Sequence, residues 1–196
     1  PSVLVNASAV GYFGTSLDGR FEESSPVGQD FLARLCQKWE QAAAEKPAAT
    51  RLVVLRIGIV LSSEGGALAK MLPVFRAGVG GPIGSGQQWM SWIERGDLCR
   101  IIQSSLETDS WSGVINAVAP DPVTMAVFAG SLGRCLGRPS LLAVPGPMLQ
   151  LLLGDGSKVV LEGQFVSSSR LDALGFNFLC PTLPVALDVA TSSSNR

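Results

Sequence analysis

The ten residues 52–61, LVVLRIGIVL, constrain the fold of this chain most strongly. They are too uniformly apolar to alternate between a buried and a solvated face, and the turn-rich SSEGG follows them directly. Both features are typical of a strand that is covered on two sides. A shorter apolar run, Val3–Val5, begins the chain and indicates another buried strand. Two such strands predict an α/β fold, in which helices cover a sheet.

A helix is predicted between these two strands. Asp30 stands where an N-cap is expected, the sequence FLARLCQKWEQAAAEK follows it, and Pro47 ends the pattern. Phe31, Leu35 and Trp39 recur at i, i+4 and i+8, so we expect them to form the apolar face of an amphipathic helix. A strand, a helix and a strand in this order make a βαβ unit, which predicts a parallel sheet.

The same patterns predict further helices and strands along the chain. These are a helix over 66–77 interrupted near Pro73, a helix over 97–106, a strand over 114–118, a helix from Thr124 closed by Gly137, a short helix over 145–156 and a small helix ending at Gly175. The final residues, TSSSNR, predict a frayed tail.

Composition excludes several classes of function. The 196 residues contain no histidine, which excludes Ser-His-Asp and Cys-His catalysis and histidine-bearing metal sites, so we predict no metal. The 15 basic and 16 acidic residues leave no electrostatic footprint for a nucleic acid or an acidic membrane. The longest apolar stretch, residues 141–154, is cut by prolines and is shorter than the roughly 18 residues of a membrane span. Four dispersed cysteines without a CxxC pair predict reduced thiols and a cytoplasmic protein.

The glycine-rich stretch GVGGPIGSGQQWMSW, residues 78–92, is a candidate ligand site. It follows a predicted helix, lacks a lysine and matches neither GxxxxGK[ST] nor GxGxxG, which argues against a phosphate-binding loop. Two interpretations stay open: the stretch lines a pocket for a small-molecule substrate, or it is a tight turn whose tryptophans pack in the core. The candidate substrate-binding residues are Gly84, Gln87, Gln88, Trp89 and Trp92.

The loop after the first strand is a further candidate site, because ligands of open α/β sheets bind outside the carboxyl ends of strands. It contains Ser8 and the only tyrosine, Tyr12, which is either a packed aromatic or a proton donor and acceptor. Arg56 lies in the longer buried strand, and a buried arginine needs an anionic partner. The candidate partners in a structural salt bridge are Glu22, Glu23, Glu94 and Asp97.

A series of motifs in a fixed order carries a family resemblance. The motifs are ASAVGYFG, DFLARLCQKWE, LRIGIVLSSEGGALAKMLPVFRAGVGGPIGSGQQWMSWIERGDL, GVINAVAPDPVT, LGRP and VLEGQ. With them the chain resembles, from about Val3 to Leu187, the extended or atypical short-chain dehydrogenase/reductases, in particular the YfcH-like and SulA-like epimerase family proteins. The resemblance implies the C-terminal part of a Rossmann-type parallel sheet with a smaller substrate-binding lobe.

The resemblance also implies domain boundaries and a cofactor. It assigns residues 1–75 to the NAD(P)-binding Rossmann domain, 76–138 to a substrate-side lobe, 139–188 to the family's C-terminal domain and 189–196 to a tail. The implied cofactor is NADP or NAD, with ASAVGYFG under the nicotinamide. The residues implied at the cofactor are Ala7, Ser8, Arg56, Gly58 and Val60, and the implied catalytic residues are Ser8 and Tyr12.

Two departures from the family pattern change the functional expectation. The glycine-rich GxxGxxG turn that holds the pyrophosphate is absent from these residues, so we expect cofactor binding only with an N-terminal part that this sequence lacks. The YxxxK pair aligns with Phe31 and Leu35, and Lys38 faces elsewhere on the helix. The expected function is therefore an NAD(P)-binding, epimerase-like protein with a nucleotide-sugar-like substrate. The alternative is a non-catalytic NADP(H)-binding regulator of cell or plastid division, with a division partner, located in the plastid stroma in a plastid-bearing organism.

Overall fold

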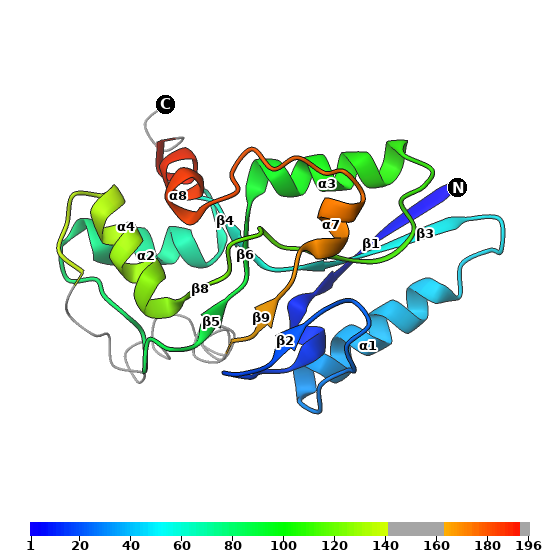
Figure 1. The fold of residues 1–196 in the computed structure, drawn as a ribbon, viewed down its shortest axis with the longest axis horizontal. Coiled ribbons are helices and arrows are strands. Elements are labelled where there is room, and N and C mark those ends of the chain that lie inside the picture. The colour runs from blue at the N-terminus through cyan, green and yellow to red at the C-terminus, as the bar shows by residue number, and fades with distance from the viewer. Residues whose placement is uncertain (141–162, 193–196) are drawn as a thin grey trace.

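A three-stranded parallel sheet forms the centre of the molecule (Figure 1). The computed structural model describes residues 1–140 and 163–192. Strands β1 (Val3–Ala9), β3 (Arg51–Ile57) and β7 (Gly113–Ala117) lie in the order β1-β3-β7. The register pairs Ser8 with Arg56 and Arg56 with Asn116. The predicted α/β fold with a parallel sheet is confirmed.

Helix α1 (Phe31–Ala44) connects β1 to β3 and begins at the predicted N-cap, because the Asp30 carboxylate accepts a hydrogen bond from the Ala33 amide at 2.8 Å. The predicted apolar face is wrong. Phe31 is 77% and Trp39 49% exposed, whereas the buried face consists of Ala33, Cys36 and Ala43. Small side chains allow a helix to lie close to a strand, so packing distance rather than hydrophobicity selects the inward face.

The predicted strand over 52–61 is two strands that belong to different sheets. β3 ends at Ile57, and β4 (Ile59–Leu61) pairs with β6 (Trp92–Glu94) in parallel. Gly58 lies at the change of direction between these two strands. A Cβ at this position would lie only 2.5 Å from the Ser91 carbonyl oxygen. The close approach of two backbones at this point therefore requires glycine.

Helices α2 (Gly66–Arg76), α4 (Met125–Cys135) and α8 (Leu183–Ser192) pack around a separate apolar core beside β4 and β6, on the left of Figure 1. Helix α2 continues through Pro73, so the predicted interruption is wrong. The buried side chains of Leu72 and Phe75 flank this proline, and their burial offsets the lost backbone hydrogen bond.

The remaining described helices and strands have the following bounds. They are the 3-10 helix η1 (Val10–Phe13), β2 (Arg20–Phe21), β5 (Trp89–Met90), α3 (Arg95–Glu107), β8 (Val123–Thr124), β9 (Phe165–Val166) and α7 (Ser169–Ala173). In Figure 1, α1 and α3 lie on opposite sides of β1 and β3. Strand β2 pairs with β9 in parallel, and β5 pairs with β8 in antiparallel orientation.

Some predicted boundaries differ from the structure. Strand β7 falls within residues 76–138, which were assigned to the substrate-side lobe, yet it pairs with β3 of the central sheet. Helix α8 extends to Ser192 and so includes half of the predicted tail 189–196. The helix predicted over 145–156 lies outside the described residues. No helix within the described ranges is long and apolar enough to cross a membrane.

Candidate functional site

A buried polar cluster lies on β1, β3 and α1. The Ser8 hydroxyl donates to a Glu40 carboxylate oxygen at 2.7 Å, and Nε and Nη2 of Arg56 each donate to the same carboxylate at 2.9 Å. Ser8 is 5% and Arg56 3% exposed. Register pairing places Ser8 and Arg56 side by side near the carboxyl ends of their strands, which is where open α/β sheets bind ligands.

The guanidinium of Arg56 also holds the loop after β1. Its Cζ lies 3.4 Å from the centre of the Tyr12 ring and 4.9 Å from that of Phe13, and Nη1 donates to the Glu23 carbonyl at 3.1 Å. A cation over an aromatic face is attracted by the ring quadrupole. Arg56 therefore fixes Tyr12 against the sheet.

The anionic partner of Arg56 is Glu40, which is not among the four acidic residues predicted for this role. Of the predicted partners, Glu23 contributes only a backbone carbonyl to Arg56, and Asp97 pairs with Arg100 instead. A signal for Glu40 is present in the sequence, because it lies seven residues after Ala33 and four after Cys36, on the inward face of α1.

Cys36 completes the inward face of α1 at this cluster. Burial raises the pKa of its thiol, while hydrogen bonds to the Ala9 backbone and to Ser8 oppose that shift. The residues of α1 that face Ser8 are thus Cys36 and Glu40. Phe31, which aligns with the tyrosine of the YxxxK pair, is 77% exposed, and Leu35, which aligns with its lysine, is half-buried; neither side chain carries a group that can relay a proton.

The other residues predicted at the cofactor lie in two different sheets and at the junction between them. Ala7 is exposed in the edge strand β1, and Val60 is half-buried in β4 opposite Ile93. Gly58 packs against Ser91, and its amide donates to the Ala117 carbonyl at 3.2 Å. The structure therefore places Ala7 in the central sheet and Val60 in the β4-β6 sheet, with Gly58 between β3 and β4 in close backbone packing.

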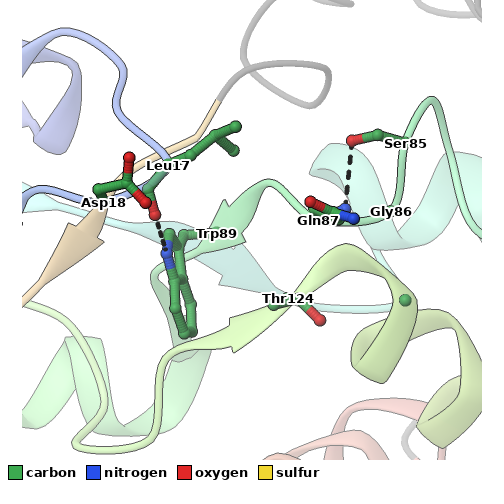
Figure 2. Close-up of a pocket in the computed structure, with 8 residues that line it drawn as sticks. Leu17, Asp18, Ser85, Gly86, Gln87, Trp89 and Thr124 are labelled. Carbon is green, nitrogen blue, oxygen red and sulfur yellow. Dashed lines mark hydrogen bonds between the residues drawn. The ribbon is translucent and has the colours of Figure 1, made fainter.

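A cavity of about 600 Å³ opens beside β5 (Figure 2). Its lining combines residues of the loop after η1 with residues of the glycine-rich stretch and the start of α4. These residues are Leu17, Asp18, Ser85, Gly86, Gln87, Trp89, Thr124 and Ala126. The cavity thus includes Gln87 and Trp89 from the predicted substrate-binding residues, and the loop residues Leu17 and Asp18 were missed.

Gln88 and Trp92 do not line this cavity, so the pocket interpretation is corrected for these two. Gln88 is 2% exposed and donates to the Ile83 carbonyl at 2.9 Å. Trp92 is fully buried, and its indole N–H donates to the Asp121 carbonyl at 2.8 Å. The alternative interpretation, a tryptophan packed in the core, describes Trp92. Gly84 is exposed, with a φ of 60° that suits a turn.

The segments that surround the cavity are tied together by direct contacts. The Trp89 indole N–H donates to the Leu17 carbonyl at 2.7 Å (Figure 2), and its ring meets Phe165 edge-on at 5.0 Å. The Ser16 amide donates to the Gly163 carbonyl at 3.0 Å. A Cβ on Gly163 would lie 1.8 Å from the Trp89 carbonyl oxygen, so only glycine fits here.

Glu94, Asp97 and Cys180 bring three potential metal ligands within 4.8 Å of one another. The Asp97 carboxylate already accepts the amides of Leu179 and Cys180 at 3.0 and 2.8 Å, and a Glu94 oxygen accepts the Asp97 amide at 3.1 Å. Burial raises the pKa of the Cys180 thiol to about 11. These contacts anchor the chain before α8 onto α3, which is a structural role.

Known proteins resemble this chain over most of its length. The "Epimerase family protein SDR39U1 homolog, chloroplastic" of Arabidopsis thaliana is 51% identical over 91% of this chain and 51% of its own length. A crystal structure of human epimerase family protein SDR39U1 with NADPH is 40% identical, with a TM-score of 0.93 over 98% of this chain and 66% of that one. A nucleoside-diphosphate sugar epimerase structure from Corynebacterium glutamicum is 31% identical, with a TM-score of 0.73 over 97% of this chain and 38% of that one.

Residues 144–190 also match a family described as "Domain of unknown function (DUF1731)". The chain spans about half the length of the plant protein and about two thirds of the length of the human structure. Its described residues share the Rossmann-like fold of epimerases and short-chain dehydrogenase/reductases.

Proposed function

We propose that this chain is part of an NADP(H)-binding, epimerase-like protein of the short-chain dehydrogenase/reductase superfamily. The observation that carries the proposal is the convergence of Ser8, Tyr12 and Arg56 at the carboxyl ends of β1 and β3. The human relative solved with NADPH supports the choice of cofactor. A nucleotide-sugar-like substrate in the cavity beside β5 is part of the same proposal, and the Corynebacterium relative supports it.

The residues at this edge fit a nicotinamide ring better than a phosphate. Ala7 is small and exposed, so a flat ring can approach the backbone there. Arg56 is buried and already bonded to Glu40 and the Glu23 carbonyl, so it holds Tyr12 and Ser8 in place rather than binding a phosphate. A bound nicotinamide would supply a hydride acceptor or donor, and Tyr12 is the only phenol in the chain that can transfer a proton.

A specific observation favours a second candidate, a protein that binds NADP(H) without turnover. The α1 residues that face Ser8 are Cys36 and Glu40, so neither a tyrosine nor a lysine stands there to relay a proton. A regulator of cell or plastid division, working through a protein partner, belongs to this candidate. The chloroplast relative supports a location in the plastid stroma, and the cytoplasm is the alternative location.

The test is a titration of the full-length protein with NADPH and with NADH, followed by tryptophan fluorescence. We expect saturable quenching that is stronger with NADPH, and an Arg56→Met variant that binds more weakly because Tyr12 is released. Absence of any response to either nucleotide would refute the proposal. Turnover that falls at least tenfold in Tyr12→Phe supports the enzyme, and binding without turnover supports the second candidate.

A further inference from the structure

We propose that the end of the molecule formed by α2 and α4 is a docking surface for an acidic segment of a partner protein. The inference goes beyond the proposed function, because the basic residues of this surface belong neither to the polar cluster nor to the cavity. Its basis is a separation of charge along the sequence. Residues 66–93 and 122–140, which contain both helices, include four basic residues and no acidic residue.

All four basic residues, Lys70, Arg76, Arg134 and Arg138, are exposed. None of them forms a salt bridge with another described residue. Arg134 donates a hydrogen bond to the Ser131 hydroxyl at 2.9 Å, and this acceptor carries no charge. The guanidinium and ammonium groups at this end of the molecule are therefore available to carboxylates from outside it.

The acidic side chains beside this surface have other partners. Asp188 of α8 accepts a hydrogen bond from the Cys135 thiol at 3.2 Å, and Glu64, just before α2, pairs with Arg95. Outside residues 66–93 and 122–140, the described part of the chain contains more acidic than basic side chains. The balanced charge of the whole chain thus conceals a positive end and a negative remainder. Such a charge distribution favours the approach of an acidic partner to the positive end.

Two of the arginines lie close together in space. Helices α2 and α4 lie on the left of Figure 1 and share one apolar core. A Cβ on Gly78, two residues after Arg76, would lie 3.9 Å from the ring of Pro139, which directly follows Arg138. Val79, next to Gly78, is 53% exposed. An exposed apolar side chain beside arginines has the composition of a protein interface, in which polar groups surround an apolar centre.

An acidic protein segment fits this surface better than a nucleic acid or a membrane. Three of the four basic residues are arginines, which bind carboxylates through two parallel hydrogen bonds and are enriched in protein interfaces, where lysine is depleted. No aromatic side chain of residues 66–93 and 122–140 is exposed to stack on a base. The acidic remainder of the molecule repels an extended polyanion or an anionic bilayer, whereas a short peptide contacts the positive end alone.

A role in helix stability does not account for all four residues. Arg76 and Arg134 lie in the last turns of α2 and α4, where a positive charge interacts favourably with the helix dipole. Arg138, however, lies beyond the end of α4, and Lys70 lies in the middle of α2. Arg138 is therefore the residue whose replacement tests docking most directly.

The experiment measures the binding of a fluorescein-labelled poly-glutamate peptide to the full-length protein by fluorescence anisotropy. We expect saturable binding that weakens between about 50 and 200 mM salt. Arg76→Glu combined with Arg138→Glu should raise the dissociation constant about tenfold, because each change replaces an attraction by a repulsion. Arg138→Glu alone should raise it less, and Arg138→Lys, which keeps the charge, least. The matched control, Arg34→Glu combined with Lys38→Glu, changes two exposed basic residues of α1 and should leave the dissociation constant unchanged.

Four results would overturn the inference. They are no binding of the peptide at low salt, an equal loss of affinity in the α1 control variant, tighter binding of oligothymidylate or of phosphatidylserine vesicles than of the peptide, and displacement of the peptide by UDP-glucose. The last result would assign the surface to a small-molecule substrate. NADPH binding is measured separately by tryptophan fluorescence. A protein that binds NADPH but not the peptide fails this inference and keeps the proposed function, and one that binds the peptide but not NADPH does the reverse.

Discussion

Replacing Glu40 with alanine should destabilise the fold strongly, because it leaves a buried arginine without its counter-ion. Arg56 is 3% exposed and donates two hydrogen bonds of 2.9 Å to this carboxylate, and the Ser8 hydroxyl donates a third at 2.7 Å. Removing one partner of a buried ion pair costs about 3–5 kcal/mol. The Glu40 side chain is 13% exposed, so water can partly solvate the Arg56 charge that remains after the substitution. We therefore expect the lower value, about 3 kcal/mol.

This loss is large enough to measure by urea unfolding and by thermal melting. In a chain of this length 1 kcal/mol corresponds to about 2–4 °C, so we expect Tm to fall by about 6–12 °C. Glu45→Ala is the matched control, because Glu45 is an exposed carboxylate at the end of the same helix; it should change stability by less than about 0.5 kcal/mol.

A double-mutant cycle separates the ion pair from general effects on packing. Glu40→Leu combined with Arg56→Met removes both charges and keeps apolar volume, and such replacements are often neutral. We therefore expect the double variant to regain about 2 kcal/mol relative to the sum of the single changes. A cost below about 1 kcal/mol for Glu40→Ala, or strictly additive effects in the cycle, would refute the argument.

Three further predictions concern backbone packing, a buried thiol and a helix cap. Gly58→Ala should cost about 1–3 kcal/mol in urea unfolding, because its Cβ would lie 2.5 Å from a carbonyl oxygen, whereas Gly65→Ala, with open space around its Cβ, should be neutral. Burial raises the pKa of the Cys180 thiol from 9.0 to about 11, so between these pH values the unfolded chain loses this proton while the folded state keeps it. The free energy of unfolding should therefore fall between pH 9 and 11; a Cys180→Ala variant whose free energy of unfolding falls equally steeply over this range would contradict this. Asp30→Ala should cost about 1 kcal/mol, because it removes the acceptor for the Ala33 amide, and unchanged urea unfolding would argue against the cap.

Local chemistry made part of the fold predictable. The helix beginning at Asp30 depends on a side chain that caps an amide three residues away, and the strand around Val54 depends on an uninterrupted apolar run. These determinants lie within a few residues of the element that they specify. The inward face of α1 was not predictable in this way, because its small residues matter only once the helix lies against β1.

The candidate site was predictable only where its residues share one segment. Gln87 and Trp89 were identified from the glycine-rich stretch, but the cavity is completed by Leu17 and Asp18, and the Trp89–Leu17 hydrogen bond joins residues 72 positions apart. The Glu40–Arg56 pair is likewise set by how α1 crosses the sheet. Partners of this kind depend on tertiary packing, which no short sequence pattern encodes.

The loop after β1 links the two sites physically, which leads to a final prediction. Tyr12 of this loop lies under Arg56, and five residues later Leu17 accepts the hydrogen bond from the Trp89 indole. Loosening Arg56 with Glu40→Gln should therefore shift the indole N–H resonance of Trp89 in NMR spectra, although Glu40 is not among the cavity residues. The loop has another anchor, because the Gly28 amide donates to the Tyr12 carbonyl at 2.9 Å. If the resonance does not move while stability falls, the remaining contacts of the loop are sufficient to fix it, and the polar cluster and the cavity act independently.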